Sequence, residues 1–232
     1  SRKSHLTPDM LSLIGALESF FKTRDDAGRI VCATKTGVYA FYDYDGEPIY
    51  VGQTYESIRT RIRRHLTNQR TDAVAMHVLD PLEVARVEVW PRQDLDAQAM
   101  STRRQWLDRA EFTVYTRLLG QARVSRLLNE KAPAPALPIE LPESYAGEIV
   151  SAEIMARLGH SDERIARRAA TIANLAQVIK ERDVSLGLRR TLVTQAKRLE
   201  LLATARHDEV AGETPPEQVA RETERSGEED NG

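Results

Sequence analysis

The fold is decided by the stretch from Gly37 to His65, which reads GVYAFYDYDGEPIYVGQTYESIRTRIRRH. Strand-forming residues alternate over residues 38–42 and return over 49–51, with Asp45-Gly46 between the two runs. An Asp-Gly pair between two such runs is a strong signal for a β-hairpin with a two-residue loop. The sequence therefore predicts an antiparallel pair of strands here.

Counting outward from a two-residue loop predicts the register of the hairpin. Because side chains alternate across a strand, Tyr39 and Tyr50 should lie on one face as diagonal neighbours. Gly52 has no side chain, so we expect open space opposite Tyr39. The predicted pairs are Tyr42 with Ile49, Phe41 with Tyr50, Ala40 with Val51 and Tyr39 with Gly52, and the predicted core face holds Val38, Ala40, Ile49 and Val51.

A helix should follow the hairpin, because Ile58, Ile62 and Leu66 recur every four residues. Arg61 and His65 are also four residues apart, so they should project together beside this apolar stripe. Each feature alone has an ordinary explanation in packing or in a solvated surface. Together they predict that two phenols, a guanidinium and an imidazole converge on one small region.

This stretch resembles the GIY-YIG nuclease superfamily. Gly37-Val38-Tyr39 stands at that family's first triplet and Tyr50-Val51-Gly52 at its second, each with Val in place of Ile. Arg61 matches the helix arginine of the family, and His65 matches a histidine found in some branches. The resemblance is strong over residues 36–66, weaker to residue 129, and absent from the C-terminal third.

A second helix, predicted over residues 101–119, contributes a carboxylate. Glu111 lies on its apolar side, where a carboxylate is costly unless it is paired or bound to metal. The resemblance implies that Glu111 is the metal-binding glutamate of the family, and that Asn129, at the end of a predicted short helix, is its asparagine. The simpler alternatives are an ion pair for Glu111 and a helix C-cap for Asn129.

The whole pattern predicts an α+β fold, with a small three-stranded antiparallel sheet flanked by helices and followed by a C-terminal helical extension. The third strand is expected near residues 84–90, and a helix near residues 8–21 should cover the sheet. A proline-rich connector at 132–138 places a boundary near residue 140. We expect a nuclease domain over 1–140, a helical extension over 141–208 and an acidic disordered tail over 209–232.

The extension has two apolar helical faces, over residues 151–180 and 185–207, which an antiparallel hairpin would bury together. Its simplest role is packing on the nuclease domain, and the alternatives are homodimerisation and DNA contact. We also expect a chain that ends before Ser151 to fold.

The charge and the composition of the chain limit the partners that it can have. The net charge is −2, but nine acidic and two basic residues lie in 208–232, so the rest of the chain is basic. Four arginines near Arg61 are predicted to contact DNA phosphates: Arg59, Arg63, Arg64 and Arg70. The single cysteine excludes an internal disulfide and a multi-cysteine zinc module. Without a signal peptide or an apolar run that could cross a membrane, we expect a cytoplasmic protein.

Hydrolysis of a phosphodiester needs a base, charge stabilisation at phosphorus and help for the leaving oxygen. One central carboxylate favours a single divalent cation, Mg²⁺ or Mn²⁺, at Glu111. Arg61 suits the phosphate because its planar fork matches two oxygens. Tyr39, oriented by Tyr50, is the favoured base if nearby cations lower its pKa, and His65 is the rival because an ordinary imidazole titrates near neutral pH.

The sequence thus predicts a metal-dependent DNA endonuclease, most similar to compact restriction-type members of the superfamily. Its tight hairpin lacks the insertion that the compact restriction branch can carry between the two triplets. The alternatives are a structure-selective DNA repair nuclease, a catalytically inactive nucleic-acid-binding module and a helical interaction protein. RNA also stays open as a substrate.

Overall fold

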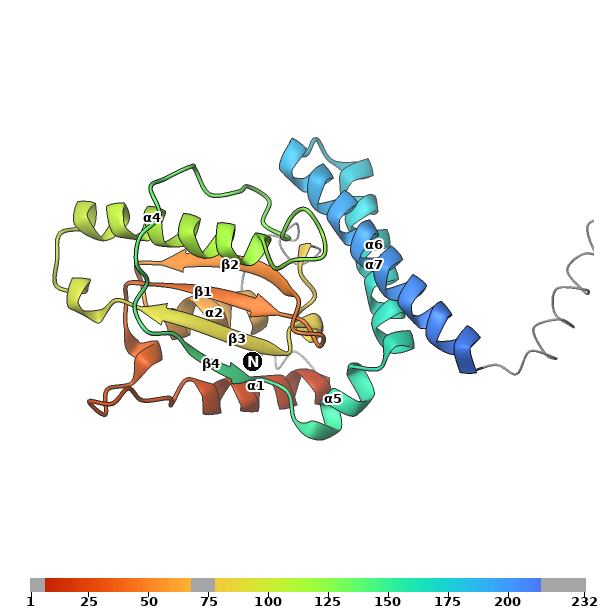
Figure 1. Ribbon diagram of the computed structural model, residues 1–232, viewed down its shortest axis with the longest axis horizontal. Helices are drawn as coiled ribbons and strands as arrows, with labels where there is room; N and C mark the ends of the chain where they lie inside the picture. Colours follow the sequence, from red (N-terminus) through yellow and green to blue (C-terminus); the bar gives the residue numbers. More distant parts are fainter. Residues whose placement is uncertain (1–6, 68–77, 214–232) are drawn as a thin grey trace, which may run out of the picture.

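The computed structural model describes residues 7–67 and 78–213. Its strands form one antiparallel sheet, with helices on both faces and a helical hairpin at one end (Figure 1). The main elements are α1 (Pro8–Phe20), β1 (Gly37–Tyr42), β2 (Pro48–Thr54), α2 (Ile58–Thr67), β3 (Arg86–Pro91), α4 (Met100–Leu119), β4 (Tyr145–Glu148), α5 (Ala152–Leu158), α6 (Ser161–Glu181) and α7 (Leu186–Glu213).

The sheet has four strands in the order β2-β1-β3-β4, so the prediction of three strands was wrong. The fourth strand, β4, pairs with β3 from Arg86–Glu148 to Val89–Tyr145. Four residues with a glycine among them carry little strand signal in the sequence. The glycine has a packing reason, because a Cβ on Gly147 would lie 2.7 Å from the ring of Phe20 on α1.

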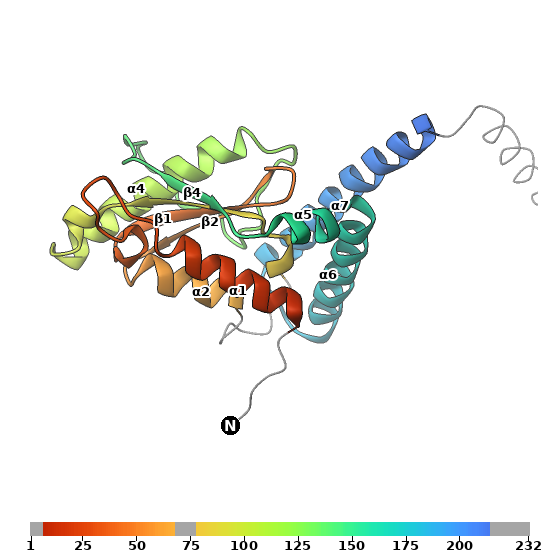
Figure 2. The same cartoon turned by 90° about the horizontal axis from the view of Figure 1, so that it is seen from below.

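The two faces of the sheet are covered by different helices. α1 and α2 lie on one face and α4 on the other (Figure 2). Tyr39 and Phe41 point into the core under α1 and α2, whereas Val38 and Ala40 point into the core under α4. The alternation predicted for β1 is therefore present, and it places Tyr39 on the side of α2.

The hairpin register is confirmed from Phe41–Tyr50 to Tyr39–Gly52 but not at the turn. The turn spans Asp43 to Glu47, whose backbone groups bond at 3.0 Å, and the register shifts between Phe41 and Tyr42. Tyr42 therefore pairs with Pro48 in place of Ile49. Ile49 packs in the core beside Tyr39, and not on the opposite face as predicted, because a bulge reorients the side chains around it.

The helical extension packs on the domain that holds the sheet, as its simplest role predicted. α6 and α7 run side by side as an antiparallel hairpin (Figure 1). Leu175, Val178 and Leu188 from these helices belong to the same apolar core as α1 and α2. This shared core argues against the expectation that a chain ending before Ser151 folds. α7 continues to Glu213, beyond its predicted end at residue 207, and the rest of the predicted tail lies outside the described residues.

None of the helices in residues 7–67 and 78–213 is long and apolar enough to cross a membrane.

Candidate active site

Four predicted side chains meet beside the hairpin. Tyr39 is fully buried on β1, and its hydroxyl accepts a hydrogen bond of 3.4 Å from Nε of Arg61 on α2. The rings of Tyr39 and Tyr50 lie 6.3 Å apart, and the ring of His65 lies 5.8 and 5.3 Å from them. The diagonal placement of the phenols and the four-residue spacing on α2 together produce this cluster.

Gly52 gives Tyr39 the room for its ring. A Cβ on Gly52 would lie 2.3 Å from the Tyr39 hydroxyl and 2.4 Å from the carbon that carries it. The space opposite Tyr39 is therefore occupied by the Tyr39 side chain itself and is not the open gap that we predicted. Any larger residue at position 52 would have to displace the phenol from Arg61.

The pKa of the Tyr39 phenol lies well above the ordinary value of 10. Burial is the main cause, the neighbouring Tyr50 and Glu111 add to it, and Arg61 opposes it. The predicted effect of a nearby cation is thus present but smaller than the effect of burial. Without further positive charge, the phenol keeps its proton at neutral pH.

His65 is a neutral imidazole in this setting. Burial, with Arg61 and Arg64 nearby, lowers the pKa of His65 to about 4. Its Nε2 atom is buried and has no hydrogen-bond partner within the described part of the chain. The ring can therefore accept or donate one more hydrogen bond at neutral pH, but it is a weaker base than a free imidazole.

Glu111 reaches the same region from α4. Gln53 of β2 donates one hydrogen bond to Glu111 Oε2, at 3.0 Å, and another to Asp108 Oδ1, at 3.1 Å. The pKa of Glu111 is raised to about 7; burial is the main cause and Asp108 adds to it, while Gln53 and Arg61 oppose it. Within residues 7–67 and 78–213 no ion pair to Glu111 forms, so the alternative of an ion pair is not supported.

Gln53 and Asp108 were not predicted from the sequence. Gln53 directly follows the second triplet, and Asp108 lies three residues before Glu111, so the two carboxylates share one side of α4. These spacings are the only signals that could have indicated them.

Asn129 lies on the outer edge of β2. Its amide oxygen accepts from the Val51 N–H at 3.2 Å, and its amide nitrogen donates to the Val51 carbonyl at 2.7 Å. The neighbouring Leu128 N–H donates to the Ile49 carbonyl at 2.8 Å. Asn129 thus continues the hydrogen-bonding pattern of the sheet, and it is not a C-cap, because the predicted short helix before it does not form.

A comparison with protein families identifies this arrangement. Residues 35–98 match the model of the GIY-YIG catalytic domain. This segment therefore carries the GIY-YIG catalytic domain that the sequence resemblance predicted. The match covers both triplets, α2 and β3, whereas Glu111 and Asn129 lie beyond it. Searches of the curated proteins and of the solved structures gave no match.

The GIY-YIG site has the donor chemistry for one divalent cation. Glu111 is a half-buried carboxylate whose one direct partner is the amide of Gln53, and the second carboxylate of Asp108 lies on the same amide. Within the described residues, no group of three or more His, Cys, Asp or Glu side chains gathers to form a closed metal cage. Mg²⁺ fits such a site, because it commonly takes one or two carboxylates and keeps water and phosphate oxygens as its other ligands.

Three of the four arginines predicted to bind DNA beside the GIY-YIG site already have partners. Arg59 and Arg63 both pair with Glu18 of α1, and Arg64 pairs with Glu56 at 2.6 Å. Arg70 lies outside the described residues. These ion pairs neutralise much of the predicted basic patch, so its contact with phosphates stays a prediction.

Arg104 of α4 is an exposed cation that sequence analysis missed. It lines a pocket of about 310 Å³ together with Arg61, Gln53 and Asp108. Its guanidinium lies 5.8 Å from the ring centre of the exposed Tyr55. The pocket therefore opens beside Arg61 and gives a phosphate a second cation close to the GIY-YIG site.

Proposed function

We propose that this protein is a divalent-metal-dependent endonuclease that hydrolyses phosphodiester bonds in DNA. The observation that supports it best is the uncompensated charge of Glu111, a half-buried carboxylate with no cation paired to it in the described residues and with a pKa of about 7. Arg61 is equally incomplete, because its hydrogen bond in this region goes to a phenol. A metal ion and a phosphate would complete both.

The geometry supports the following proposed roles. Arg61 binds the phosphate at the reacting centre, where its planar fork matches two oxygens. Glu111, with Asp108 beside it, would hold one Mg²⁺ or Mn²⁺ ion. When bound, the ion supplies charge stabilisation to the phosphate and the leaving oxygen. Asn129 is a positioning residue that fixes the strand carrying Tyr50.

Tyr39 is the proposed general base, with Tyr50 orienting it. Glu111 raises the pKa of Tyr39, so neutralising Glu111 removes that contribution and leaves the opposing effect of Arg61. His65 is the second candidate base, because its neutral ring has an unpartnered nitrogen beside both phenols. In that case Tyr39 would orient the attacking water.

A restriction-type function is the more specific proposal. It is supported by the single cysteine, which leaves no zinc module, and by the helical addition to a compact core. A nuclease that selects DNA structure, or one that has lost catalysis, are the alternatives.

Nicking of supercoiled plasmid by the purified protein tests the proposal. We expect cleavage with Mg²⁺ and none with EDTA. Glu111→Ala should lower the cleavage rate by at least roughly a thousandfold, because a metal contributes several kcal/mol to charge stabilisation. Glu200→Ala, which removes an exposed carboxylate of α7, is the matched control and should cut normally.

A second variant tests the phosphate contact. Arg61→Lys keeps the charge but loses the fork, so its cleavage rate should fall strongly. Cleavage that survives both Glu111→Ala and EDTA would overturn the metal-dependent mechanism. Binding of DNA without any cleavage by the wild type would favour the inactive binding module, and mapping of cut sites would separate sequence selection from structure selection.

A further inference from the structure

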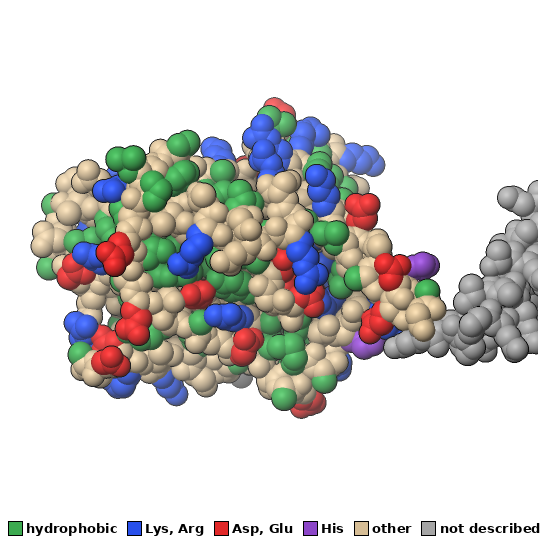
Figure 3. Space-filling model, viewed as in Figure 1, with side chains coloured by type: hydrophobic (Ala, Val, Ile, Leu, Met, Phe, Trp, Pro, Cys, Tyr) green, Lys and Arg blue, Asp and Glu red, His purple; other side chains and the backbone are tan. Residues whose placement is uncertain are grey.

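A basic groove lies between the segment after α4 and the first half of α7. Its cations are Arg126, Arg190 and Lys197, all of them exposed, and it encloses about 130 Å³. Ser125 and Val193 also line it. Figure 3 shows Lys and Arg side chains gathering over the end of the molecule where α6 ends and α7 begins.

The cations of this basic groove differ from those of α2. No carboxylate within residues 7–67 and 78–213 forms an ion pair with Arg126, Arg190 or Lys197. Arg59 and Arg63, in contrast, share Glu18. An unpaired surface cation attracts phosphate without first losing a partner, so the groove is the stronger site for a polyanion.

Helix geometry fixes the spacing of two cations along the groove. Arg190 and Lys197 are seven residues apart on α7, which places them on one face and about 10 Å apart along the axis. That separation spans several phosphates of one DNA strand, which advances about 3.4 Å per nucleotide. Both cations can therefore contact the same backbone.

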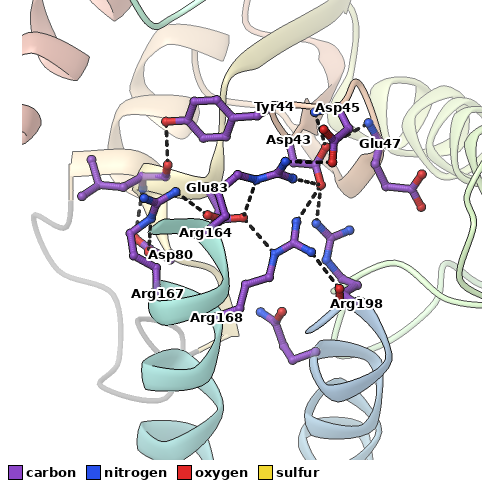
Figure 4. Close-up of polar contacts among 12 residues, drawn as sticks. Asp43, Tyr44, Asp45, Glu47, Asp80, Glu83, Arg164, Arg167, Arg168 and Arg198 are labelled. Carbon is purple, nitrogen blue, oxygen red and sulfur yellow. Dashed lines mark hydrogen bonds and ion pairs between the residues drawn. The ribbon is translucent and has the colours of Figure 1, made fainter. Parts of the chain in front are cut away.

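The basic groove is held in a fixed position relative to the nuclease core. Arg168 of α6 and Arg198 of α7 both donate to Asp43 Oδ2 in the hairpin turn, at 2.9 and 2.7 Å (Figure 4). At the start of α7, Ser185 donates to Glu130 Oε1 at 2.5 Å. The helices are thus attached to the turn of the hairpin and to the segment beside β2.

The same segment connects the groove to the candidate active site. Arg126 lies in the groove, and three residues later Asn129 pairs with the backbone of Val51 on β2. Tyr50 is the preceding residue on that strand. One short segment of the chain therefore joins the groove to the strand that carries Tyr50.

We propose that the basic groove formed by Arg126, Arg190 and Lys197 binds the phosphate backbone of duplex DNA that flanks the cleavage site. The proposal rests on the proposed nuclease function, because the phosphodiester chemistry nearby is what identifies DNA among the possible polyanions. The helical extension then has a substrate-binding role in addition to its packing role.

The test measures binding without cleavage. A fluorescent 30-base-pair duplex is titrated with protein in EDTA, over a range of salt concentrations. Each phosphate contact contributes about 0.9 to the slope of log affinity against log salt concentration. The triple variant Arg126→Ala, Arg190→Ala, Lys197→Ala should lose roughly 2 to 3 from this slope and bind at least about tenfold more weakly at low salt.

Two matched variants make the result specific. Arg29→Ala with Arg157→Ala removes two exposed cations that are already paired with Asp25 and Asp9, and its slope should change by less than about 1. A charge-conserving set, Arg126→Lys, Arg190→Lys and Lys197→Arg, should keep the wild-type slope. Loss of binding in that set as well would mean that shape and not charge is responsible, and would overturn the proposal.

Three other results would also overturn it. They are an unchanged slope in the alanine triple, no binding of the duplex by the wild type, and groove-dependent binding to anionic phosphatidylserine vesicles but not to DNA. Because the assay contains no metal, failure of the nuclease proposal is seen separately: a wild type that binds through the groove but never nicks plasmid would reject the proposed catalysis alone.

Discussion

Two regions of this molecule take arginines out of water, and they do so in opposite ways. In the arginine–carboxylate cluster, formed by Asp43, Glu83, Arg164, Arg168 and Arg198, every arginine has a carboxylate within ion-pairing distance (Figure 4). In the candidate active site, Arg61 meets a phenol and Glu111 meets an amide. Each arginine of the cluster thus has a carboxylate partner within the protein, whereas the charged groups of the site would gain theirs only from bound ligands.

The difference shows that buried charges attach the helical extension in the cluster, whereas in the candidate active site they are available for chemistry. Breaking a buried ion pair is costly because it leaves an uncompensated charge, so the cluster fixes α6 and α7 on the hairpin turn. Buried groups without counter-charges have shifted pKa values, as Glu111 and His65 do, and such groups concentrate at functional sites. Stability and function should therefore respond to different substitutions.

The largest expected effect is on catalysis. Tyr39→Phe should lower single-turnover cleavage by roughly 10²–10⁴-fold, because one positioned proton acceptor contributes about that much. Stability should change little, since the lost hydroxyl has a single long hydrogen bond from Arg61. Tyr42→Phe is the matched control, because it removes a hydroxyl from the opposite face of the same strand.

The pH profile separates the two candidate bases. With Tyr39 as base, the logarithm of the cleavage rate should rise with pH beyond 8, because the phenol keeps its proton below its raised pKa. With His65 as base, the rate at saturating Mg²⁺ should be constant above about pH 5, since the pKa of His65 is about 4. A Tyr39→Phe protein that cuts at the wild-type rate would exclude Tyr39.

The next effect is on stability alone. Asp43→Asn removes the negative charge that Arg168 and Arg198 share, so unfolding in urea should become easier by about 3–5 kcal/mol. Glu56→Gln breaks the exposed pair with Arg64 and should cost less than about 1 kcal/mol. Equal losses in the two variants would remove the distinction between a buried ion-pair cluster and a surface pair.

A further expected effect is on the pH dependence of stability, through the proton on Glu111. Its pKa of about 7 lies above the unfolded value of 4.5, so the folded state binds this proton more tightly than the unfolded state. Its contribution to stability is therefore complete below about pH 4.5 and is lost as the pH rises through about 7. In the metal-free protein, Glu111→Gln should flatten this part of the stability profile, as measured by thermal unfolding.

Metal binding at Glu111 has to displace the same proton. The Mg²⁺ concentration that gives half-maximal cleavage should then be about tenfold higher at pH 6 than at pH 8. Asp108→Asn should lower the pKa of Glu111, because Asp108 raises it, and should reduce this dependence on pH. A half-saturating Mg²⁺ concentration that is the same at both pH values would argue that the ion binds elsewhere.

The sequence by itself determined the local geometry of the site. Side chains alternate along a strand with a period of two residues, which puts Tyr39 and Tyr50 on one face of the hairpin. Side chains on a helix recur about every four residues, which puts Arg61 and His65 on one side of α2. The inward position of Glu111 on α4 is fixed by the same helical spacing. These relations hold within one element or across one tight turn, so they could be predicted without knowledge of the rest of the fold.

Only the tertiary structure decided what surrounds these side chains. Asp43 and Arg198 are 155 residues apart, and the pairing of Asn129 with Val51 spans 78 residues, so no local pattern in the sequence predicts either contact. The same holds for β4, for the pairing of Glu18 with the arginines of α2, and for the basic groove. The pKa values of Tyr39, His65 and Glu111 also belong here, because burial is the main cause of each shift, and burial depends on how distant segments pack together.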